Sequence, residues 1–182
     1  AYFDYAQKLG LEGNVSQMTR DSMSYVAAQK LYLENKTEQA ISSFTNYLNN
    51  YPKGYYRNDA LFFLSDCYVR DGRDDDAIKS LTTLAAEGHN QYSERVLDKL
   101  SSMCYKKEMF EQAAVAYRSL YDEASTSAAK INAASGYVAS TLKYADDEGL
   151  VKMADDVEKM AEVNDVARRK SQYAKASVLT RQ

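Results

Sequence analysis

The sequence predicts an all-α fold built from antiparallel helix pairs, and three observations support this prediction. Only one proline and seven glycines occur among the 182 residues, whereas sheet proteins need turn-forming residues at short intervals. Successive segments place their apolar residues at the spacing of an amphipathic helix. A set of small and large apolar residues also recurs at a nearly constant interval, which is typical of helical-pair repeats.

The repeat consists of four apolar positions at offsets of 0, 4, 13 and 17 residues. These positions hold Ala27, Leu31, Ala40 and Phe44, then Leu64, Tyr68, Ala77 and Leu81, and then Leu100, Cys104, Ala113 and Tyr117. The alanines Ala40, Ala77 and Ala113 are 37 and 36 residues apart. An alanine lets two helices cross closely, and the large residue four positions later fills the groove beside the crossing. Three copies in register therefore predict three similar helix pairs.

The predicted pairs occupy residues 19–52, 55–88 and 91–124. In the first pair, Asn35 marks the break between the helices, and Thr37 is the expected N-cap of the second helix. That helix ends at Tyr51-Pro52, because the residue before a proline is pushed out of helical geometry.

The second and third pairs show equivalent breaks. Asp71-Gly72 stops the first helix of the second pair, and Asp74 to Asp76 place negative charge on the first turn of the next helix, where the helix dipole favours it. The third pair breaks near Lys107-Glu108 and resumes at Phe110. The acidic run from Asp71 to Asp76 is therefore interpreted as a helix start, since it lacks the ligand spacing of a calcium loop.

The flanking segments complete a single predicted domain over residues 1–182. An N-terminal helix or cap is expected within residues 1–13, a degenerate repeat within 127–163 and a terminal helix at 165–182. The terminal helices offer a surface for self-association. Because the chain begins with Ala1, it is also expected to be a processed or excised piece of a longer protein.

Several of these residues carry a family resemblance. The pattern Leu61-x-x-Leu64-Ser65-x-x-Tyr68, followed by Gly72 and Ala77, resembles the tetratricopeptide repeat signature, as does Ala40-x-x-x-Phe44 followed by Pro52. The resemblance covers residues 19 to 124 and departs from the family in lacking its tryptophan. It implies a right-handed superhelical stack. The connecting segment 50–56 is similar to those of divergent repeats in bacterial envelope proteins, which favours a periplasmic or envelope location over the cytoplasm.

Composition and motifs bound the function. A net charge of −3 gives no electrostatic reason to expect nucleic acid or an anionic membrane as the main partner, and no apolar stretch reaches the length of a membrane-spanning helix. Cys67 and Cys104 lie within apolar helical patterns and are predicted to be buried thiols, with a disulfide as the alternative. His89 lies in a connecting segment. Without a catalytic or metal-binding pattern, we expect no enzyme activity, cofactor or metal.

The resemblance also implies where a partner binds. First helices line the concave wall of such stacks, and projecting the family's inward positions onto this chain selects twelve residues. They are Tyr25, Gln29, Tyr32, Phe62, Asp66, Arg70, Asp98, Ser102, Tyr105, Lys106, Lys143 and Tyr144. Aromatic side chains mixed with single charges suit recognition of a protein or peptide, although tyrosines on helices also pack between neighbouring pairs. The prediction is a non-catalytic scaffold or adaptor, and the alternative is the helical arm of a larger enzyme or glycan-uptake component.

Overall fold

The computed structural model describes residues 17–181, and within this range the chain forms helices and no strands. The helices are α2 (Gln17–Leu33), α3 (Thr37–Asn50), α4 (Arg57–Arg70), α5 (Asp74–Ala86), α6 (Ser93–Lys106), α7 (Phe110–Glu123), α8 (Ser127–Tyr144), α9 (Asp147–Lys159) and α10 (Asp165–Arg181). The predicted all-α stack of helix pairs is confirmed. The helix or cap expected within residues 1–13 lies outside the described residues.

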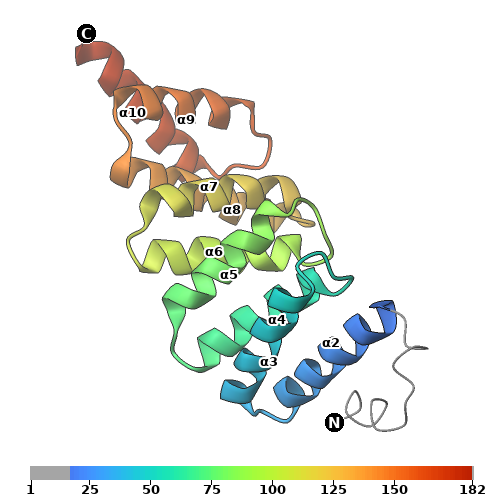
Figure 1. Ribbon diagram of the computed structural model, residues 1–182. Coiled ribbons are helices and arrows are strands. Elements are labelled where there is room, and N and C mark those ends of the chain that lie inside the picture. The colour runs from blue at the N-terminus through green and yellow to red at the C-terminus, as the bar shows by residue number, and fades with distance from the viewer. Residues whose placement is uncertain (1–16, 182) are drawn as a thin grey trace, which may run out of the picture. The chain divides into compact units, whose positions relative to one another are not determined.

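The chain divides into two compact units, residues 1–90 and 91–182. We call them unit 1, which contains α2 to α5, and unit 2, which contains α6 to α10; they run from blue to green and from yellow-green to red in Figure 1. A single domain forming one continuous superhelix stays a prediction, and each unit is described by itself below.

The three predicted breaks fall between helices and share one backbone geometry. Asn35, Gly72 and Glu108 have positive φ angles of 57°, 71° and 59°. The amides of the next residues, Lys36, Arg73 and Met109, donate to the carbonyls of Leu31, Tyr68 and Cys104 at 3.0, 2.8 and 2.8 Å. This is the Schellman ending, in which one left-handed residue turns the chain and satisfies free carbonyls of the last helical turn. Each left-handed residue precedes a repeat alanine by five positions, so the turn and the helix crossing recur together.

The repeat alanines and the large residues beside them form the cores. Ala40, Ala77 and Ala113 are fully buried, as small residues at a close helix crossing should be. In unit 1, Phe44 is fully buried in a cluster contributed by α2, α3 and α4. Tyr25 joins this cluster by stacking on Tyr56 with a ring-centroid distance of 4.3 Å.

A buried polar cluster fixes the connection between the two helix pairs of unit 1. Asp21 accepts hydrogen bonds from the Tyr47 hydroxyl and, at 2.9 Å, from the amide of Tyr55. The Tyr47 oxygen in turn accepts from the amide of Tyr56 at 3.0 Å. We call these four residues the loop lock. A Cβ at Gly54 would lie 2.5 Å from the Tyr47 oxygen, so the lock leaves room only for glycine there.

Unit 2 departs from simple pairing beyond α7. Helix α8 packs most extensively on α7, and α9 packs most extensively on α10. Gly136 of α8 allows the first contact, because a Cβ there would lie 2.5 Å from the ring of Tyr117 on α7. Arg118 of α7 reaches past α8 to Asp156 of α9, with Nε 2.6 Å from Oδ2. The fourth predicted pair, α8 and α9, still packs through a shared buried cluster that includes Val138 and Met153, and Arg118 links α9 to α7.

Candidate functional site

In unit 1, three of the predicted binding residues meet where α2 lies against α4. The Tyr32 hydroxyl donates to Asp66 Oδ2 at 2.7 Å. Arg70 lies one helical turn after Asp66, and its Nη2 is 3.0 Å from Asp66 Oδ2. The same nitrogen donates to the Tyr32 oxygen at 2.8 Å, and the guanidinium carbon lies 4.2 Å from the centroid of the Tyr32 ring. We call Tyr32, Asp66 and Arg70 the α2–α4 cluster.

Hydrogen bonds and charge interactions hold the side chains of the α2–α4 cluster in place. Burial raises the pKa of Tyr32 to about 12, and its hydrogen bond to Asp66 acts in the same direction. Tyr32 is therefore a neutral donor at physiological pH. Because Arg70 is clamped by an aromatic face and a carboxylate, little side-chain entropy remains to be lost when a partner contacts it.

The other predicted residues of unit 1 differ in their exposure. Tyr25 and Phe62 are each 4% exposed. Phe62 also contacts the ring of Phe63 edge-on at 5.6 Å. Gln29 is partly buried on α2. The polar edge of α2 and α4 is therefore the part of the predicted wall that a partner can reach.

In unit 2, the predicted residues lie in two groups. Asp98, Ser102 and Lys106 are exposed along α6. The other group surrounds Phe110 of α7, whose ring meets Tyr105 edge-on at 5.3 Å and has the Lys143 ammonium 6.0 Å from its centroid. Tyr144, at the end of α8, is 46% exposed. The structure thus brings Tyr105 and Lys143 to one aromatic centre.

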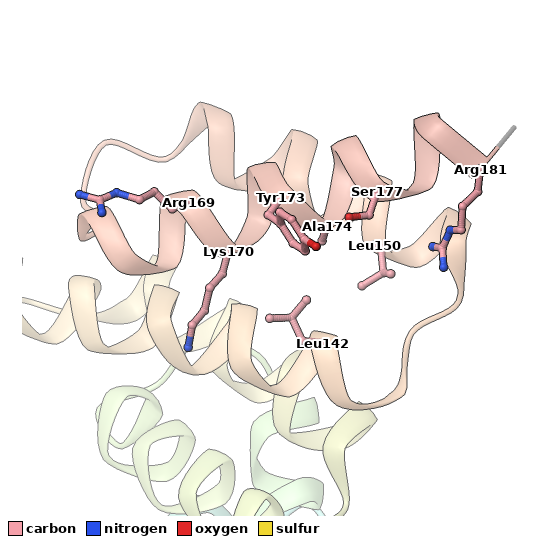
Figure 2. A pocket seen from close by; sticks show the side chains of 8 residues that line it. All are labelled: Leu142, Leu150, Arg169, Lys170, Tyr173, Ala174, Ser177 and Arg181. Atoms are coloured by element: carbon pink, nitrogen blue, oxygen red, sulfur yellow. The ribbon is translucent and has the colours of Figure 1, made fainter.

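A groove that was not predicted lies between α8, α9 and α10, which we call the α10 groove. Its volume is about 510 Å³. Leu142 of α8 and Leu150 of α9 line it, and α10 contributes Arg169, Lys170, Tyr173, Ala174, Ser177 and Arg181. In Figure 2 the two leucines lie between Lys170 on one side and Arg181 on the other. The α10 spacing at positions 170, 173, 174, 177 and 181 follows one helix face, which was the only signal in the sequence.

The other candidate reactive residues of the sequence are two cysteines and one histidine. No group of three or more His, Cys, Asp or Glu side chains between residues 17 and 181 could hold a metal ion. Cys67 and Cys104 are buried free thiols, and burial raises the pKa of Cys67 to about 11. His89 is exposed in the segment after α5. Over the same residues, no helix has both the length and the apolar character needed to cross a membrane.

Comparison with known proteins agrees with this architecture. Residues 23–54 match the family model of the tetratricopeptide repeat. A tetratricopeptide repeat protein from Parabacteroides merdae has a similar structure, with a TM-score of 0.55 and 14% sequence identity over 91% of this chain. A putative kinesin light chain from Podosopora anserina gives a TM-score of 0.47 at 11% identity, over 91% of this chain and 87% of that one. No curated protein matches the sequence.

The chain therefore contains a segment, residues 23–54, that matches a tetratricopeptide repeat, and its fold is similar to that of a tetratricopeptide repeat protein. It spans 62% of the length of the P. merdae protein. Proteins of this fold generally mediate protein–protein interactions and are typically not catalysts. The resemblance to envelope proteins in particular stays a prediction.

Proposed function

We propose that this protein is a non-catalytic scaffold that binds a segment of a partner protein along the first helices of its repeats. The α2–α4 cluster is the single observation that carries the proposal. It combines a rigid aromatic ring, a carboxylate and a guanidinium on adjacent first helices. Rigid rings supply contact area at small entropic cost, and fixed charges set the register of a bound segment.

In unit 2, the exposed Lys106 of α6 serves the same purpose. Both cations stand at the last turn of their helices, Arg70 in α4 and Lys106 in α6. A partner segment that carries carboxylates can thus be bound at equivalent places in two repeats.

The test is affinity capture with chemical crosslinking, using the full chain as bait in a lysate of its source organism. Charge reversal by Arg70→Glu or Lys106→Glu should remove the specific partner while the helical circular dichroism signal is retained. The matched controls are Lys79→Glu on α5 and Lys152→Glu on α9, which reverse exposed lysines on second helices. If the first-helix variants capture every partner as well as the control variants do, the proposed binding surface is wrong.

A further inference from the structure

The α10 groove differs from the rest of the chain in its charge. The whole chain has a net charge of −3, yet Arg169, Lys170 and Arg181 line this groove and no acidic side chain does. Arg181 is tied to Asp147, with Nη2 2.7 Å from Oδ1. Arg169 and Lys170 are exposed and form no ion pair with the described residues that would neutralise them. The groove therefore presents an uncompensated positive edge.

The interior of the groove is apolar. Leu142 is 40% exposed and Tyr173 is 77% exposed. Leu150 and Ala174 line the same space. A volume of about 510 Å³ lies within the usual range of ligand-binding clefts, roughly 300–1,000 Å³. Apolar side chains of a ligand would cover the leucines and the tyrosine ring and release the water around them.

We propose that the α10 groove binds an acidic protein segment that places an apolar side chain between Leu142 and Leu150 and its carboxylates beside Lys170 and Arg169. This inference rests on the proposed scaffold function and names the chemistry of one ligand. Figure 2 shows the arrangement that carries it, with Lys170 extending from α10 toward α8 on one side of the leucines.

A protein segment fits this groove better than other anionic ligands. A free phosphate would be bound by the cations but would leave the leucines and Tyr173 exposed to water. An anionic membrane or nucleic acid attracts proteins through a broad basic face, whereas α9 of the same unit begins with the acidic residues Asp147 and Glu148, and Asp147 pairs with the groove residue Arg181. Alternating apolar and acidic side chains match both features of the groove at once.

The experiment is a phage-display selection of random peptides on the full-length chain, followed by fluorescence anisotropy with the enriched peptides. We expect peptides that combine Leu, Ile or Phe with Asp or Glu, and no binding once their acidic residues are replaced by lysine. The double variant Arg169→Glu/Lys170→Glu should weaken binding by roughly 10-fold or more, since two charge contacts are each reversed. Tyr173→Ala should also weaken it, whereas Tyr55→Ala, which removes a tyrosine of 73% exposure in unit 1, and Lys152→Glu should not.

The outcomes separate this inference from the proposed function. The enriched peptides can fail to bind the Arg70→Glu or Lys106→Glu variant and yet bind the groove variants normally. In that case the proposed scaffold function is retained, and the α10 groove is not its acidic-peptide site. If no peptide is enriched, the inference for the α10 groove fails, whereas the scaffold proposal is decided by the capture experiment with Arg70→Glu and Lys106→Glu. Sedimentation with phosphatidylglycerol vesicles that depends on Arg169 and Lys170, with no peptide dependent on them, would replace the protein ligand by a lipid surface and overturn the inference.

Discussion

Glu108 occupies a position that favours glycine, and replacing it should stabilise unit 2. It has a φ angle of 59°, in the left-handed region, at the same place in its repeat where Gly72 has a φ of 71°. A left-handed conformation costs a residue with a Cβ about 1–2 kcal/mol. Glycine adopts it freely, but it also gains about 0.5–1 kcal/mol of conformational entropy in the unfolded chain. The difference predicts that Glu108→Gly raises the free energy of unfolding by about 0.5–1 kcal/mol.

The assay is urea denaturation followed by circular dichroism at the helical band. Glu108 is exposed, so Glu108→Ala removes the side chain but keeps the Cβ and should leave stability nearly unchanged. Gly72→Ala provides the reverse test, because a Cβ there would contact nothing within 4 Å, and only the backbone conformation should cost free energy. We expect it to destabilise unit 1 by about 1 kcal/mol. The reasoning is refuted if Glu108→Gly unfolds at the same urea concentration as Glu108→Ala, or at a lower one.

Three further results are expected. Tyr47→Phe removes the central hydroxyl of the loop lock and should lower the free energy of unfolding by about 2 kcal/mol, because it leaves a buried carboxylate short of a partner; an unchanged urea midpoint would contradict this. Iodoacetamide should modify Cys67 about 100-fold more slowly in the folded chain than in urea, since burial raises its pKa from 9.0 to about 11 and only the thiolate reacts. Burial also raises the pKa of Cys104, so this thiol should react more slowly in the folded chain as well. Equal rates of modification in folded and unfolded protein would show that these thiols are accessible. Burial raises the pKa values of Tyr32 and Tyr137 from 10.0 to about 12. The folded state therefore keeps protons that the unfolded state loses, so stability is full below pH 10 and falls between pH 10 and 12; spectrophotometric titration at the tyrosinate band, with parallel urea titrations, measures both.

The helix pairs were predictable because their signals are local. Each helix pair contains its own three signals. They are a small residue at the helix crossing, a large residue four positions later and a turn residue five positions before the crossing. The sequence therefore located the breaks at Asn35, Gly72 and Lys107-Glu108 without knowledge of the tertiary structure. Beyond α7 the prediction was less accurate. The sequence paired α8 with α9, but Gly136 lets α8 approach α7 closely, and α8 packs more extensively on α7 than on α9.

The binding surface was less predictable because exposure depends on the neighbours of each side chain. Tyr25 occupies a position that faces the partner in the family pattern, yet it stacks on Tyr56 from the connection before α4. The α10 groove combines residues from three helices, and Leu142 and Leu150 have the spacing of ordinary core residues. Nothing in their local sequence distinguishes a leucine in a groove from a leucine in the core, so only the assembled helices reveal the site.

The loop lock has a consequence for how unit 1 opens. In repeat proteins each hairpin interacts only with its neighbours, so one hairpin can detach from the next while each stays folded. Here, detachment of the α2–α3 hairpin from α4 would separate Asp21 from the amide of Tyr55 and the Tyr47 hydroxyl from the amide of Tyr56, and would leave buried polar groups without partners. That penalty joins both hairpins into one cooperative element. The amides of Tyr55 and Tyr56, although they lie in a connection between helices, should therefore exchange with deuterium as slowly as the centre of α3.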